Sequence, residues 1–87
     1  MVNAKRKAVE DRLLEIEEEA YVADGFDDAI IGLIEKSDAC QVVYSTHAII
    51  EILSKDMDYE SAWEYFEFNV RGSYLGSKEP LYMDLVC

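Results

Sequence analysis

The stretch Ala29-Ile30-Ile31-Gly32-Leu33-Ile34, followed after a short gap by Gln41-Val42-Val43-Tyr44, decides the fold class of this chain. Both runs are short and apolar, so periodicity alone does not separate helix from strand. Gly32 and the many β-branched side chains favour strands, and Ser37-Asp38-Ala39 between the runs is typical of a turn. We therefore predict an antiparallel hairpin, while a helix over residues 27–36, which would make the fold all-α, remains the alternative.

A first helix is predicted upstream of the hairpin, over residues 3–21. This window contains neither Gly nor Pro, and its apolar side chains recur with the period of a helix that buries one face. The apolar stripe consists of Val9, Leu13, Ile16 and Ala20, widened by Leu14. Asp24-Gly25 follows, and we expect it to end the helical stretch because glycine adopts the left-handed conformation easily.

Two more helices are predicted downstream of the hairpin. Ser45 and Asp58 are suited to N-cap them, because short polar side chains accept hydrogen bonds from the free amides of a first turn. The second helix should end near Lys55 and bury Ile49, Ile50, Ile52 and Leu53. The third helix, residues 59–71, carries the strongest periodic pattern of the chain, which consists of Tyr59, Trp63, Phe66, Val70 and Tyr74.

Together these elements predict an α+β fold in one domain, residues 1–87. Three helices would pack on a small antiparallel hairpin or on a three-stranded sheet. The third strand would be Leu81-Tyr82-Met83, added at the edge of the hairpin. Hydrophobic residues make up 51% of the chain, which is enough to form a core and excludes a disordered protein.

Acidic residues dominate the charge of the chain. Eight Lys and Arg against 19 Asp and Glu give a net charge of −11. Direct binding of nucleic-acid phosphates needs a surplus of cations and is therefore excluded. No stretch approaches the roughly 20 apolar residues of a membrane helix, and no apolar run follows the basic N-terminal residues as it would in a signal peptide. We expect a soluble cytoplasmic protein with two free thiols, Cys40 and Cys87.

Enzymatic and metal chemistry have little support in the sequence. His47 and Glu51 are spaced to share a helix face, as a general base and its orienting carboxylate would, but an exposed pair without function is the stronger interpretation. The aspartates Asp24, Asp27 and Asp28 lack the spacing of a calcium loop, and no Cys and His pairs are spaced for zinc. We therefore expect no enzyme, no cofactor and no bound metal.

Eight carboxylates and no Lys or Arg lie between Leu13 and Glu35, and this acidic band is the most informative feature of the sequence. A surface of one sign speeds association with a partner of the opposite sign. The alternative is that the charge only keeps the protein in solution. The partner-binding residues predicted within the acidic band are Glu15, Glu17, Glu18, Glu19, Asp24, Asp27 and Asp28.

Four aromatic side chains exceed what one face of a small core needs. They are Tyr65, Phe68, Tyr74 and Tyr82. Aromatic residues are enriched at the centres of protein interfaces. These side chains therefore indicate either self-association or docking of a partner, or else closure of the core over a sheet.

A series of motifs runs through residues 21–83. They are Tyr21, Asp24-Gly25-Phe26, Ala29-Ile30-Ile31-Gly32, Val42-Val43-Tyr44, Ile50-Glu51-Ile52-Leu53, residues 59–70 (YESAWEYFEFNV), Gly72, Tyr74, Gly76 and Pro80. With these motifs the chain resembles a set of small acidic proteins encoded by tailed bacteriophages. The resemblance implies a phage product that acts in the cytoplasm of a bacterial host, and it implies no active site.

Charge and resemblance together lead to one functional hypothesis and one alternative. The hypothesis is a non-catalytic phage accessory protein that uses the acidic band to bind a basic surface on a bacterial host protein and inhibit it. The expected target is a nucleic-acid-handling defence complex of the CRISPR or restriction type. The alternative is a homo-oligomeric structural or scaffolding protein, in its simplest form a homodimer, with no inhibitory role.

Overall fold

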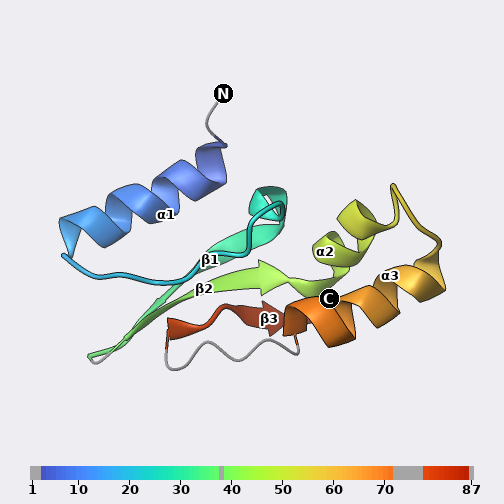
Figure 1. Cartoon of the computed structure of the whole chain (residues 1–87). Coiled ribbons are helices and arrows are strands. Elements are labelled where there is room, and N and C mark those ends of the chain that lie inside the picture. The colour runs from blue at the N-terminus through green and yellow to red at the C-terminus, as the bar shows by residue number, and fades with distance from the viewer. Residues whose placement is uncertain (1–2, 38, 72–77, 87) are drawn as a thin grey trace.

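The computed structural model describes residues 3–37, 39–71 and 78–86. Its helices and strands, in chain order, are α1 (Ala4–Glu15), β1 (Ile30–Glu35), β2 (Cys40–Ser45), α2 (Thr46–Leu53), α3 (Tyr59–Tyr65) and β3 (Leu81–Met83) (Figure 1). A 3-10 turn (Asp27–Ala29) precedes β1, and a π-helical turn (Phe66–Arg71) continues α3. The predicted α+β fold is confirmed, and the all-α alternative is wrong because residues 30–35 form a strand.

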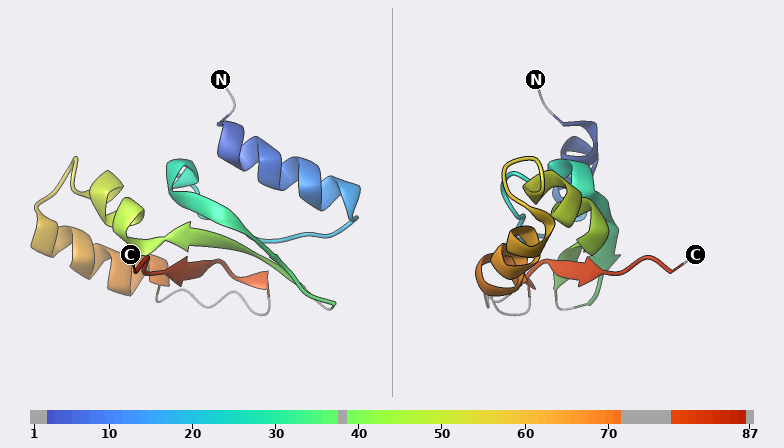
Figure 2. Two further views of the ribbon diagram at one scale, coloured as in Figure 1. Left: turned by 180° about the vertical axis from the view of Figure 1, so that it is seen from behind. Right: turned by 90° about the vertical axis from the view of Figure 1, so that its right-hand side faces the viewer.

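The sheet has three strands in the order β1-β2-β3. β1 and β2 form the predicted antiparallel hairpin. The predicted third strand is present, but β3 runs parallel to β2, so the sheet is mixed. Parallel neighbours require a long crossover connection, and the chain uses α2 and α3 for it. These two helices lie together at one end of the molecule, while α1 lies over β1 at the other (Figure 2).

The central strand β2 is buried over its whole length, from Cys40 to Ser45. A strand that is paired along both edges and covered on both faces favours a continuous apolar run over an alternating one. The neighbours Val43 and Tyr44, which point to opposite faces of the sheet, are accordingly both buried. Gln41 is the polar exception, and its Nε2 donates to the Glu79 carbonyl at 3.1 Å. The core cluster joins this strand to all three helices.

The edge strand β1 carries a bulge. Ile30 pairs with Tyr44 but Gly32 pairs with Val43, so Ile31 is an extra residue on this strand. Bulges bend a strand and increase its twist. Ile31 is accordingly turned toward solvent and is 42% exposed.

The first helix is shorter than predicted: α1 ends at Glu15, so the prediction of a helix to residue 21 is wrong. The Glu18 amide donates to the Leu13 carbonyl at 2.9 Å, and the Glu17 amide donates to the Leu14 carbonyl at 3.2 Å. This pair of bonds is a Schellman motif, which places Glu17 at the left-handed position with φ of 56°. The chain then runs back along the sheet, because Ala20 and Val22 pack on the core outside any helix.

Both predicted N-caps are confirmed. Ser45 Oγ accepts from the Ala48 amide at 3.2 Å, and Asp58 Oδ1 accepts from the Ser61 amide at 2.7 Å. The hydrogen bond from the Ser61 amide lowers the pKa of Asp58, because it stabilises the carboxylate. The second helix ends at Leu53, slightly before the predicted end near Lys55. The third helix covers the predicted residues 59–71, but as an α-helix followed by the π-helical turn.

Aromatic rings join α3 to the sheet. Phe66 is fully buried and meets Trp63 at 5.9 Å and Tyr82 at 5.3 Å, both edge to face, and Tyr82 also packs against Tyr44 at 5.9 Å. Tyr59 was predicted on the buried stripe, but it is 65% exposed because it lies in the first turn of α3, beyond the edge of the core. Tyr74, predicted on the same stripe, lies outside the described residues.

Replacing Glu17 with glycine should stabilise the protein. A residue with a Cβ costs roughly 1 kcal/mol in the left-handed conformation, and glycine avoids this cost. We expect Glu17→Gly to raise the free energy of unfolding by about 1 kcal/mol in urea denaturation. Glu18→Gly is the control, and it should not stabilise, since Glu17 is the one non-glycine residue with positive φ in the described chain. Equal effects of the two variants would contradict the Schellman assignment.

The protein should lose stability in alkali through Tyr82. Burial raises the pKa of Tyr82 to about 12, above its ordinary value of 10. A raised pKa means that the stabilising contribution is complete below pH 10 and is lost as the pH rises toward 12. We expect Tyr82→Phe to flatten this loss in urea denaturation between pH 9 and pH 12, whereas the exposed Tyr59→Phe should keep the wild-type profile. An unchanged profile in Tyr82→Phe would refute the assignment.

Candidate partner-binding groove

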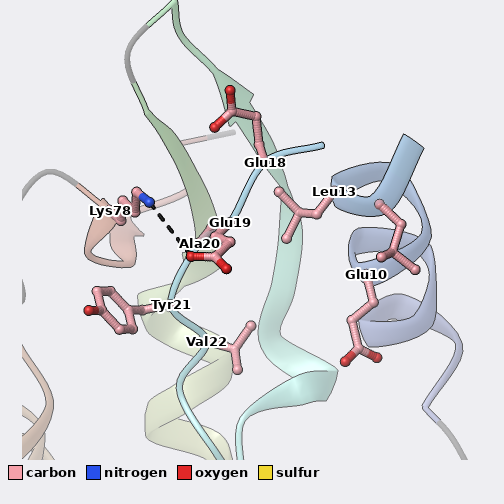
Figure 3. Close-up of a pocket in the computed structure, with 9 residues that line it drawn as sticks. Glu10, Leu13, Glu18, Glu19, Ala20, Tyr21, Val22 and Lys78 are labelled. Carbon is pink, nitrogen blue, oxygen red and sulfur yellow. Dashed lines mark ion pairs between the residues drawn. The ribbon is translucent and has the colours of Figure 1, made fainter. Parts of the chain in front are cut away.

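A groove of about 460 Å³ lies between α1 and the irregular segment that follows it, residues 18–22. We call it the α1 groove; its described lining residues are Glu10, Leu13, Leu14, Glu18, Glu19, Ala20, Tyr21, Val22 and Lys78. Figure 3 shows Glu10 and Leu13 on the helix, with Val22 on the segment directed toward them and Lys78 reaching Glu19 from the far side of the segment. Apolar side chains thus form the body of the groove, and charged side chains lie around it.

Two backbone amides fix the segment wall of the α1 groove, one to a side chain of the sheet and one to the chain before β3. The Ala23 amide donates to Tyr44 Oη at 2.7 Å, and the Tyr21 amide donates to the Lys78 carbonyl at 3.2 Å. Burial raises the pKa of Tyr44, and the hydrogen bond from the Ala23 amide opposes this shift in part. The Schellman motif at Glu17 fixes the other end of the segment.

The helix wall is held by two arginines as well as by the buried Val9 and Leu13. Arg12 binds Glu35 of β1 through two parallel hydrogen bonds, Nε to Oε2 at 3.1 Å and Nη2 to Oε1 at 2.9 Å. Such bidentate pairs fix orientation as well as distance. Arg6 Nη1 reaches Asp24 at 3.3 Å and Asp27 at 3.5 Å. The apolar and ionic contacts together seat α1 over β1.

The fold places the predicted partner-binding residues in two groups, one near the start of α1 and one around its C-terminal end. Asp24, Asp27 and Asp28 gather near the start of α1, where Arg6 pairs with the first two and the Asn3 amide donates to Asp28 at 2.7 Å. These three carboxylates therefore hold α1 in place. The sequence between Leu13 and Glu35 lacks cations, but the fold brings cations from α1 to it.

The remaining acidic-band residues lie around the C-terminal end of α1. Glu18 and Glu19 line the α1 groove. Glu15 instead pairs with Arg12 at 2.7 Å, and Glu17 is exposed at the Schellman turn outside the described lining. The interpretation of the acidic band as a docking surface remains a prediction, and Glu18 and Glu19 are the members placed beside apolar surface.

The groove contains residues that sequence reasoning did not single out as a site. Leu14 was predicted to widen the buried stripe, but it is 77% exposed because the helix ends one residue later and the chain turns away. Tyr21, at 50% exposure, adds further apolar surface. Nothing in the local sequence marked Glu10 or Lys78 as residues of a binding site. Lys78 comes next to residues 19–21 only in the folded chain.

The other residues considered for catalysis or metal binding lie outside the α1 groove. His47 Nε2 lies 2.9 Å from Glu51 Oε1, and the two side chains are 75% and 68% exposed. Cys40 is buried in the core. In residues 3–37, 39–71 and 78–86, no three His, Cys, Asp or Glu side chains come together as metal ligands. Within the same ranges, no helix has the length and apolar character needed to cross a membrane.

The aromatic residues predicted for an interface separate into two kinds. Tyr82 packs against Phe66 and Tyr44 in the core. Tyr65 and Phe68 are 44% and 80% exposed on α3 and the π-helical turn. Tyr74 lies outside the described residues.

No protein-family model, curated protein sequence or solved structure matches this chain.

Removing the Tyr44 hydroxyl should loosen the segment wall. Tyr44→Phe leaves the Ala23 amide without its acceptor, which costs about 1–2 kcal/mol in a buried setting. We expect a loss of that size in urea denaturation and faster hydrogen exchange at the Ala23 amide. Tyr65→Phe, which removes an exposed hydroxyl, should change neither. Unchanged exchange at Ala23 in Tyr44→Phe would show that other contacts hold the segment.

Proposed function

We propose that this chain is a non-catalytic binding protein that captures a basic segment of another protein in the α1 groove. The supporting observation is the composition of the groove, whose lining combines the exposed Leu14 and Tyr21 with the carboxylates of Glu10, Glu18 and Glu19. Apolar contact supplies affinity at the centre of an interface, and surrounding charges select the sign of the partner. The net charge of −11 also steers cationic partners toward the protein.

The biological role that we propose is inhibition of a bacterial host protein by occlusion of a basic surface. Proteins that handle nucleic acids carry such surfaces, because they must neutralise phosphates. Carboxylates of this chain would occupy the places of those phosphates. With the resemblance to small acidic phage proteins, the proposed target is a host defence complex of the CRISPR or restriction type, met in the host cytoplasm.

Self-association is the second candidate function. It is favoured by Tyr65 and Phe68, which expose aromatic surface on α3 and the π-helical turn. Against it stands the charge beside them, since Glu60 and Glu64 are also exposed on α3 and would face their own copies across a symmetric contact. Size-exclusion chromatography with light scattering distinguishes the two, because self-association gives a dimer mass.

Capture should depend on the carboxylates of the α1 groove. We expect the protein immobilised on resin to retain a bacterial protein, identified by mass spectrometry, that is released above about 0.5 M salt, where exposed charges are screened over a few ångströms. Glu18→Gln/Glu19→Gln should reduce retention of that protein at least several-fold.

The control variant Glu60→Gln/Glu64→Gln makes the same change of net charge on α3, away from the groove. It should retain the same protein at close to the wild-type level. Equal loss in both variants would mean that net charge alone drives capture. Full retention by Glu18→Gln/Glu19→Gln would contradict the proposed site.

A further inference from the structure

Lys78 is the one cation among the described residues that line the α1 groove, and the same lining includes the three carboxylates of Glu10, Glu18 and Glu19. Its Nζ lies 3.8 Å from Glu19 Oε2 (Figure 3). This distance is an ion pair without a direct hydrogen bond. The Lys78 side chain is 39% exposed and that of Glu19 is 89% exposed, so water competes for both groups. Pairs of this kind are weak and exchange partners readily.

The backbone of Lys78 is held independently of its side chain. The Lys78 carbonyl accepts from the Tyr21 amide at 3.2 Å, which ties this residue to the segment wall. The ammonium can therefore leave Glu19 while the groove keeps its shape. The lining residues carry three carboxylates and one ammonium, a net charge of 1 − 3 = −2. Glu10 lies 3.8 Å from Arg6 Nε and Glu19 lies 3.8 Å from Lys78 Nζ, so Glu18 is the lining carboxylate to which the described ion pairs assign no cation.

We infer that the Lys78 ammonium occupies the place that a Lys or Arg side chain of the partner takes on Glu19 in the complex. This inference rests on the proposed function and makes Lys78 an internal competitor. The occupant it defines is a partner segment in which a basic residue accompanies a Leu-sized apolar side chain. The apolar side chain packs on Leu14 and Val22, while the cation displaces Lys78 from Glu19 and approaches Glu18.

Charge disfavours a second copy of this chain as the occupant. Its Arg6 and Arg12 are engaged with carboxylates of their own chain. Two chains that each carry −11 also repel one another at long range. Charge complementarity therefore selects a cationic segment of a different protein as the occupant.

The test uses a fluorescein-labelled peptide that alternates Arg and Leu, titrated with the full chain and followed by anisotropy at low salt. Lys78→Gln should tighten binding about two- to fivefold, because the competing cation is gone. Lys55→Gln is the matched control, since it makes the same change in net charge from an exposed position outside the described groove lining. It should change the dissociation constant by much less.

A double variant separates competition on Glu19 from a general charge effect. In a Glu19→Gln background, Lys78→Gln should no longer tighten binding, because the carboxylate for which Lys78 competes with the peptide is already absent. A peptide with Ser in place of Leu should bind several-fold more weakly, and one with Glu in place of Arg should not bind. Equal binding of the Ser peptide would overturn the apolar half of the inference.

The outcomes distinguish this inference from the function on which it rests. Equal tightening by Lys78→Gln and Lys55→Gln overturns the competitor role, while the proposed function stands if Glu18→Gln/Glu19→Gln still weakens peptide binding. No effect of Glu18→Gln/Glu19→Gln overturns both. Urea denaturation of each variant checks that folding is intact.

Discussion

The side chain of Tyr44 is the contact on which the architecture depends. It is fully buried in the central strand, its ring packs on Tyr82 of β3, and its hydroxyl accepts the Ala23 amide. One residue thus joins β2, the parallel strand and the segment that returns from α1. The α1 groove exists because this bond holds the segment on the sheet while α1 is held above β1. The binding surface is in this way a consequence of core packing.

Much of the fold could be predicted from sequence because the relevant signals are local. The two apolar runs predicted the hairpin, and Ser45 and Asp58 predicted where α2 and α3 begin. The end of α1 could not be predicted, because Glu17 is a good helix former and adopts the left-handed conformation only when the chain turns back to pack on the sheet. The parallel direction of β3 likewise depends on how α2 and α3 return the chain.

The candidate site was harder to predict than the fold. The sequence identified an acidic band, but it did not show that α1 supplies Arg6 and Arg12 to part of it. The order of charges along α1, basic first and acidic last, opposes the helix dipole, and the ion pairs of these arginines give a structural reason for it. Glu18 and Glu19 were within the predicted site, whereas Lys78, remote in sequence, had no signal.

The bulge at Ile31 affects whether copies of the protein can associate through the edge strand β1. An edge strand with apolar side chains offers unpaired backbone groups to any other strand, which is the usual start of sheet extension and aggregation. β1 is such an edge, with Ile31 and Ile34 exposed. The extra residue breaks the regular ladder there, and the Arg12–Glu35 pair fixes charge at the far end of the strand. A strand that is irregular at one end and charged at the other is a poor template for pairing, so the bulge and the ion pair protect this edge of the sheet against strands of other copies.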